Sequence, residues 1–174
     1  MIHSDLTQCH VNTVRLLIAP FTAADANDVY QAITPTLTRF LTFEPEESPE
    51  AFANIWQSWL PLIREGEEIF FVARLRDTRE FVGMGGIHNL HSQTPELGIW
   101  VKESLHKKGY GREMLHAMTK WASERYQPPY FIYPVAEQNT PSRRLAESLG
   151  ATQHGRRENI KYDCVVYHLP AIAD

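Results

Sequence analysis

Three strand-like segments follow one another directly in the middle of the chain, and they constrain its fold more than any other feature. Residues 68–75, 81–88 and 96–101 are rich in branched and aromatic side chains, and the polar turn RDTRE separates the first two. Helical patterns precede and follow this run. Because a sheet built from such strands buries its apolar faces only against other elements, the pattern predicts a sheet with helices packed on it.

The order of the remaining segments predicts a mixed α/β fold of the α+β kind, in a single domain spanning residues 1–174. We expect Pro61 to kink or interrupt the second helix, because proline lacks a backbone N–H. The expected order is β-α-α-β-β-β-α-β-α-β-β, a central twisted sheet of about seven strands flanked by about four helices. Besides the three strands above, we expect strands at 13–21, 130–137, 151–157 and 162–169, and helices at 22–37, 48–66, 109–126 and 140–150.

Charge and composition exclude several classes of function. A net charge of −4 over 174 residues argues against a general nucleic-acid binder, whose affinity depends on neutralising phosphates. No run approaches the roughly 18 apolar residues of a membrane-spanning helix, so we expect no membrane partner. The N-terminal segment lacks the layout of a secretion signal, and the two cysteines lie far apart without metal-like spacing. A reduced, cytoplasmic protein is the simplest interpretation.

The segment ESLHKKGYGREML places two glycines and several cations just before an apolar helical pattern. A helix begins with backbone N–H groups that lack internal partners, and the helix dipole adds partial positive charge there. Gly109 and Gly111 would let main-chain amides approach a ligand closely, while Lys107, Lys108 and Arg112 add full charges. This combination suits a small anion, although spacing alone is equally compatible with a glycine-rich turn that carries solvated lysines.

Three motifs in this order resemble the GNAT superfamily of acetyl-CoA-dependent N-acetyltransferases. The segment from His106 to Gly111 resembles the family's Gln/Arg-x-x-Gly-x-Gly/Ala pyrophosphate loop, with histidine at the first position. ELGIWV, residues 96–101, resembles the fourth-strand signature of the branch that contains the ribosomal-protein N-terminal acetyltransferases. NTPSRRLAESLGA resembles that branch's Asn-x-x-Ser helix start followed by Leu-Gly, and the element order is similar from about Thr13 to Leu169.

The resemblance implies acetyl-CoA as co-substrate, no metal, and a primary amine as acceptor, either a protein N-terminus or a small molecule. In this family the pyrophosphate binds main-chain amides of the turn, and the pantetheine arm pairs with the edge of the fourth strand. The start of the helix at residue 140 would approach the pantetheine or the thiol. Carried over position by position, the expected coenzyme contacts are Ile99, Trp100, Val101, His106, Lys107, Lys108, Gly109, Tyr110, Gly111, Arg112, Asn139, Ser142 and Arg143.

Glu96 and Ser142 are the expected catalytic residues. An amine is protonated near neutral pH, so a base or a water relay has to remove a proton before the amine attacks the thioester carbonyl. The resembling enzymes often carry a carboxylate at the position of Glu96, which makes it the candidate base; the competing interpretation is a solvated residue at a strand end. Ser142 is the candidate acid for the leaving thiolate, and a plain bonding role in the first helical turn is the equal alternative.

Two further points of the mechanism follow from the resemblance. The family's oxyanion donor is a main-chain N–H of the fourth strand, here expected near Trp100 or Val101. Ala146 stands where many relatives carry a tyrosine that acts as the acid, so that version of the mechanism is excluded at this position.

Two other classes compete with an N-acetyltransferase. One is a non-catalytic acyl-CoA-binding or sensing module that keeps the coenzyme turn without a productive acceptor site. The other is a nucleotide-binding phosphotransferase, which would need an acidic metal-binding motif that the sequence lacks. His88 and His91 have a spacing that metal sites use, but no third ligand accompanies them, so we expect no metal.

Overall fold

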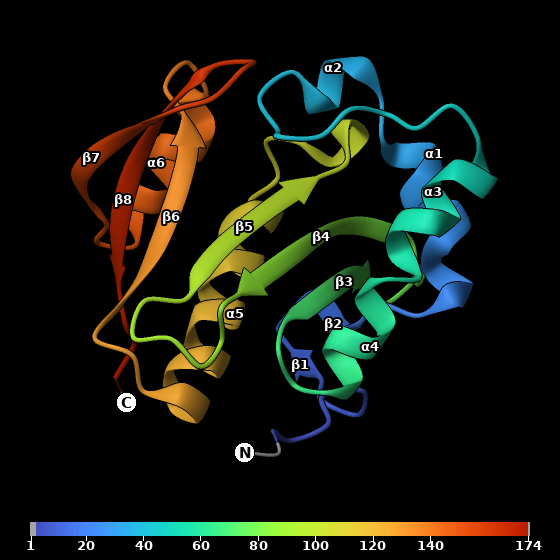
Figure 1. The fold of residues 1–174 in the computed structure, drawn as a ribbon, viewed down its shortest axis with the longest axis horizontal. Coiled ribbons are helices and arrows are strands. Elements are labelled where there is room, and N and C mark those ends of the chain that lie inside the picture. Colours follow the sequence, from blue (N-terminus) through green and yellow to red (C-terminus); the bar gives the residue numbers. More distant parts are fainter. Residues whose placement is uncertain (1–2, 174) are drawn as a thin grey trace.

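A computed structural model describes residues 3–173, and within them the strands form one eight-stranded sheet in the order β1-β2-β3-β4-β5-β6-β8-β7 (Figure 1). The predicted fold class is confirmed, with one strand more than expected: Val11–Asn12 pairs with the first long strand. The strands are β1 Val11–Asn12, β2 Leu16–Pro20, β3 Ile69–Leu75, β4 Phe81–His88, β5 Glu96–Val101, β6 Tyr130–Ala136, β7 Thr152–Glu158 and β8 Asp163–Pro170.

Two of the expected helices are divided in the structure. Ser48 begins the second one as predicted, since its hydroxyl accepts a hydrogen bond from the Ala51 N–H at 3.0 Å and Pro49 follows it. The break falls at Gln57 and Ser58, one turn before Pro61, because a proline ring clashes with the carbonyl four residues earlier. The helices are η1 Ala23–Asp25, α1 Ala26–Ala32, α2 Pro35–Thr38, α3 Pro49–Trp56, α4 Trp59–Arg64, η2 Glu103–Leu105, α5 Tyr110–Tyr126 and α6 Thr140–Ser148.

The two faces of the sheet are covered by different helices. Successive side chains of a strand point to opposite faces. On β3, Phe70 stacks on Trp59 of α4 with ring centroids 4.8 Å apart, and the next residue, Phe71, meets Trp121 of α5 edge-on at 5.2 Å. Helices α1, α3 and α4 therefore lie on the same side of the sheet as Phe70, and α5 lies on the other side (Figure 1).

The sheet separates between β5 and β6. These strands are parallel, and their pairing consists of one position, Glu96 opposite Ile132, with the Ile132 N–H bonded to the Pro95 carbonyl at 2.9 Å. Beyond that position the strands diverge, as Figure 1 shows. All other neighbouring strands are antiparallel and pair along most of their length. The free edge of β5 is thus left facing the gap.

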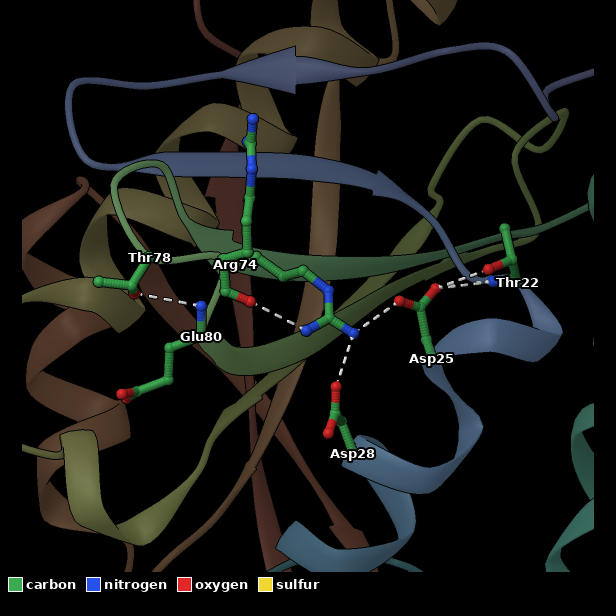
Figure 2. A network of polar contacts seen from close by, with 7 residues as sticks. Thr22, Asp25, Asp28, Arg74, Thr78 and Glu80 are labelled. Carbon is green, nitrogen blue, oxygen red and sulfur yellow. Dashed lines mark hydrogen bonds and ion pairs between the residues drawn. The ribbon is translucent and has the colours of Figure 1, made fainter.

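Arg74 of β3 fixes the position of α1 over the sheet (Figure 2). Its guanidinium donates to the carboxylates of Asp25 and Asp28 at 2.8 and 2.9 Å, and also to the Arg79 carbonyl at 3.1 Å. Asp25 in turn accepts hydrogen bonds from the N–H and the hydroxyl of Thr22, and the two residues form the capping box of η1, which leads into α1. The two carboxylate partners offset the free-energy cost of burying this guanidinium. The network therefore holds α1 against the β3–β4 turn.

Within residues 3–173, no helix combines the length and the apolar character that crossing a membrane requires.

Candidate active site

A cavity of about 450 Å³ lies where β5 and β6 diverge. Its walls come from α1, the loop after α2, β4, β5, β6, the start of α6 and the β7–β8 hairpin. Five of the expected site residues line it, and they come from two elements that are far apart in the sequence. From β5 these are Glu96, Ile99 and Trp100, and from the start of α6 they are Asn139 and Ser142.

The open edge of β5 presents main-chain amides to the gap. In a strand, the N–H and C=O of successive residues point alternately to the two neighbouring strands. Because the Pro95 carbonyl faces β6 and β5 keeps an unbroken register with β4, the amides of Leu97, Ile99 and Val101 face the gap. Of the two amides expected as oxyanion donors, that of Val101 faces the gap, whereas that of Trp100 faces β4.

Glu96 begins β5 on the face that α1 covers, with its side chain 30% exposed. Its carboxylate accepts a hydrogen bond from Arg157 of β7 at 3.1 Å. Directly opposite on β4 stands His88, whose Nδ1 lies 3.4 Å from the Glu68 carboxylate. Glu96 therefore lines the cavity at the position where β5 begins, and it has a cationic partner there.

Ser142 is held in the first turn of α6 by two neighbours. Its N–H donates to the Asn139 side chain at 3.4 Å, so Asn139 caps the helix. Its hydroxyl lies 3.0 Å from the hydroxyl of Tyr133, on β6. Burial raises the pKa of Tyr133, and the hydrogen bond with Ser142 offsets this only in part. Tyr133 therefore remains protonated at neutral pH and can donate to the serine oxygen.

Sequence reasoning did not predict that Tyr133 lies at the candidate site. The family resemblance places a tyrosine on α6, where this chain has Ala146. In the structure the tyrosine hydroxyl beside Ser142 comes from the adjacent strand β6. The available signal was the position of Tyr133 in a strand that leads directly into the Asn-x-x-Ser helix start.

The turn from His106 to Arg112, here called the cation-rich turn, connects η2 to α5. Lys107 and Gly109 have φ of 65° and 82°, the left-handed region in which glycine is unstrained and a lysine is not. Such alternation turns successive amides toward one concave side, which is how backbone binds anions. The His106 ring lies 2.5 Å from the Val101 carbonyl, so this histidine ties the turn to the end of β5.

Arg15 and Glu113 brace the cation-rich turn, and sequence reasoning missed both. The Glu113 carboxylate accepts from Arg15 Nε at 2.7 Å, from the Arg15 N–H at 2.9 Å and from the Thr13 hydroxyl. The same guanidinium donates to the Lys108 carbonyl at 2.9 Å and lies over the Tyr110 ring, 4.2 Å from its centroid. This bridge joins residue 15, just before β2, to the first turn of α5, nearly one hundred residues later.

Three other expected coenzyme contacts have partners within the protein. A side chain at Gly111 would come within 3.0 Å of Leu145 of α6, so this glycine allows α5 to pack closely. Arg112 Nε donates to the Ser148 hydroxyl at 3.3 Å. Arg143 donates to the Tyr167 hydroxyl at 3.1 Å and to the Glu137 carbonyl at 3.0 Å, contacts that join α6 to β6 and β8. Lys107 and Lys108 are exposed at the surface of the turn.

No cluster of three or more histidine, cysteine, aspartate or glutamate side chains suited to a metal ion occurs among residues 3–173. His88 lies against Phe70 and Glu68, and His91 bonds to the Gly66 carbonyl at 2.8 Å.

Comparisons with known proteins agree with this geometry. A family profile described as "Acetyltransferase (GNAT) domain" matches residues 15–152. The uncharacterized N-acetyltransferase YoaA of Bacillus subtilis is 23% identical over 168 residues, covering 91% of this chain and 95% of its own length.

Solved structures of this fold superpose over nearly the whole chain. The ribosomal L7/L12 α-N-protein acetyltransferase RimL in complex with coenzyme A has a TM-score of 0.84 at 17% identity, over 95% of this chain and 100% of its own. The spermidine N-acetyltransferase of Vibrio cholerae, in complex with CoA and spermine, has a TM-score of 0.78 at 15% identity, over 91% and 97%.

The Glu113 bridge should make the stability of the protein depend on pH. Burial would raise the pKa of Glu113, but hydrogen bonds from Thr13 and Arg15 outweigh it and lower that pKa. A depressed folded-state pKa adds stability that is fully present above the unfolded value, near 4.3, and is lost as pH falls through the folded value. Glu113→Gln should therefore lower the free energy of unfolding by about 1.5–3 kcal/mol at pH 7. Denaturant unfolding across pH 3 to 7 measures this, and the gap from wild type should close at the acid end.

Glu124→Gln is the matched control, since Glu124 pairs with Lys120 at 4.0 Å with both side chains about half exposed. It should change stability by less than about 0.5 kcal/mol. A Glu113→Gln deficit that stays constant down to pH 3 would contradict a charge-based role.

Proposed function

Because the chain belongs to the acetyltransferase (GNAT) domain family, we propose that the gap between β5 and β6 is where it transfers an acetyl group from acetyl-CoA to a primary amine, by direct attack in a ternary complex. The observation that carries this proposal is the convergence of Glu96, Ser142 and the free edge of β5 on one cavity. When bound, acetyl-CoA supplies the thioester carbonyl at which the amine reacts.

The residues of the chain fit the coenzyme. The cation-rich turn offers amides turned to one side by Lys107 and Gly109, with the positive charges of Lys108 and Arg112 beside them. These features suit a pyrophosphate, because each of its oxygens accepts hydrogen bonds and carries negative charge. The open β5 edge at Leu97, Ile99 and Val101 suits the amides of a pantetheine arm, which would pair with it as an added strand does.

Glu96 is proposed as the group that removes a proton from the acceptor amine. A carboxylate at the start of β5, where the gap begins, can take that proton directly or through one water. Arg157 orients the carboxylate from the opposite side of the cavity, so one oxygen is held while the other is available to the amine. The Val101 amide, fixed on β5, would stabilise negative charge on the carbonyl oxygen.

Ser142 is proposed as the group that delivers a proton to the leaving sulfur. If Tyr133 donates its hydrogen bond to the Ser142 oxygen, the serine proton is free to point into the cavity. The buried, protonated Tyr133, which also lines the cavity, then supports the serine through this hydrogen bond. This arrangement gives the role of the family's helix tyrosine to a pair of residues.

We also propose that residues 1–174 act as one acetyltransferase domain in the cytoplasm. The profile match and the continuous sheet support the first point. Cys9 and Cys164 are free thiols, which agrees with a reducing compartment.

An acceptor assay tests the function. The full chain is incubated with acetyl-CoA and a panel of primary amines, and both thiol release and the mass gain of one acetyl group are followed. Thiol release that requires an amine, together with the acetylated product, is expected. Coenzyme A binding without amine-dependent thiol release would identify a sensing module instead.

Glu96→Gln should lower kcat by about 10²-fold at neutral pH, because the amide cannot accept the proton. The deficit should shrink as pH rises, since more of the amine is then already unprotonated. Steady-state kinetics from pH 6 to 9.5, with coenzyme A affinity from calorimetry, measure both effects. Glu124→Gln, on the exposed side of α5, serves as control, and a deficit that does not vary with pH would make Glu96 a positioning residue.

Ser142→Ala should slow single-turnover transfer by about tenfold, while the free energy of coenzyme A binding changes by no more than about 1 kcal/mol. Because Tyr133 acts through the serine, the double variant Ser142→Ala, Tyr133→Phe should be no slower than the Ser142→Ala variant. Unchanged chemistry with weakened binding would instead make Ser142 a coenzyme ligand. Additive losses in the double variant would show that Tyr133 acts independently.

A further inference from the structure

The floor of the β5–β6 cavity is bare backbone. Gly86 of β4 stands directly opposite Gly98 of β5, on the face that α1 covers. A Cβ built at Gly98 meets no described atom within 4 Å, and one built at Gly86 meets the His88 ring first, at 3.3 Å. The neighbouring rows on the same face carry large side chains, His88 opposite Glu96 and Met84 opposite Trp100. The paired glycines therefore leave a recess beside Glu96.

The walls above this floor are aromatic and aliphatic. Phe70 of β3 lies opposite Gly86 and stacks on Trp59, which meets Phe52 edge-on with centroids 5.9 Å apart. Phe43 and Ile55, at the border of the cavity, are 39% and 38% exposed, although large apolar residues are usually covered. The cavity of about 450 Å³, which the acceptor would share with the thioester end of the coenzyme, lies within the range of pockets for small organic molecules. The body of the ligand that fits here is apolar.

The charges of the cavity match one ammonium group. Three carboxylates line it, those of Glu44, Glu46 and Glu96. Two of them already contact cations, Glu96 with Arg157 at 3.1 Å and Glu44 with Lys161 at 2.6 Å. Three negative and two positive charges leave a net charge of −1. A polyamine would bring several ammonium groups into an apolar space that already holds Arg157, and burying unpaired charge is costly.

Lys161 also bridges the two sides of the cavity mouth. It stands at the tip of the β7–β8 hairpin and donates to the carbonyl of Thr38, the last residue of α2, at 2.7 Å and to that of Phe43, on the following loop, at 3.2 Å. Residues of both segments line the cavity, so the bridge spans its opening. A polypeptide entering by its N-terminus would have to part these bonds, whereas a small molecule would not.

We propose that the acceptor is a small monoamine with a flat apolar body, such as an arylalkylamine, whose amine lies beside Glu96 and whose body lies on the floor formed by Gly86 and Gly98. This inference rests on the proposed acetyl transfer. The transfer itself forms the C–N bond and breaks the C–S bond, with the amine proton leaving toward Glu96 and one proton reaching the sulfur.

The test compares three acceptors with the full chain and acetyl-CoA: 2-phenylethylamine, spermidine, and a short peptide with a free N-terminal serine. We expect kcat/KM for 2-phenylethylamine to exceed that of the other two by at least about tenfold. A preference for spermidine or for the peptide would overturn the proposal. Coenzyme A binding with no transfer to 2-phenylethylamine would also overturn it, whereas absence of any thermal shift with coenzyme A would contradict the proposed function itself.

A matched pair of glycine variants tests the floor. Gly98→Val fills the recess and should lower kcat/KM for 2-phenylethylamine by at least about tenfold, with the coenzyme A thermal shift retained. Gly155→Val is the control, because Gly155 lies in a strand, β7, also has no described atom within 4 Å of its Cβ position, and does not line the cavity. It should leave the rate unchanged. If Gly98→Val is destabilised, the smaller Gly98→Ala gives the same comparison, and full activity on 2-phenylethylamine in both would overturn the assigned floor.

Discussion

The single parallel pairing between β5 and β6 is the constraint on which the rest of the structure depends. At Glu96 and Ile132 the strands are joined, and beyond this point the edge of β5 has no strand beside it. An unpaired strand edge inside a sheet would normally be a liability, since each exposed amide and carbonyl needs a partner. In the proposed function the free edge binds the pantetheine arm, and the cavity, the candidate base and the serine all lie around it.

The gap has its fixed form because both of its sides are built from long, well-packed elements. On one side β5 keeps full register with β4, and on the other β6 keeps full register with β8. The helix α5 joins the two sides, and its first turn is held to the start of the sheet by Arg15 and Glu113. The cation-rich turn therefore stands at a defined place relative to the β5 edge. A coenzyme bound across both would be oriented without large movements of the protein, which is how positioning contributes to transfer.

The proposed acceptor side of the cavity is built differently from the main-chain surfaces proposed for the coenzyme. There two of the three carboxylates have cationic partners from the β7–β8 hairpin, and the surface between them is glycine backbone and aromatic rings. The RimL and spermidine N-acetyltransferase structures have the same fold at 17% and 15% identity. The proposal therefore assigns the choice of amine in this chain to the side chains of this wall, since a shared fold does not fix the substrate.

The sequence by itself determined the fold class, the helix start rich in glycine and cations, and the strand that borders the gap. These are local properties: strand composition, a helix start rich in glycine and cations, and proline and serine at helix boundaries, each read from neighbouring residues. Pro61 shows the limit of such local prediction. The helix break that it causes lies four residues earlier, at Gln57.

Only the tertiary structure decided which distant residues meet. Tyr133 reaches Ser142, Arg157 reaches Glu96, and Arg15 reaches Glu113 across 98 positions of the chain. It also decided that the Val101 amide faces the gap while the Trp100 amide faces β4. Partners of this kind depend on register and on the packing of whole elements, and neither is encoded in the spacing of a short motif. The sequence therefore indicated a thioester-dependent transfer, and the assembled wall of glycine, aromatic rings and paired charges supports the proposed class of amine.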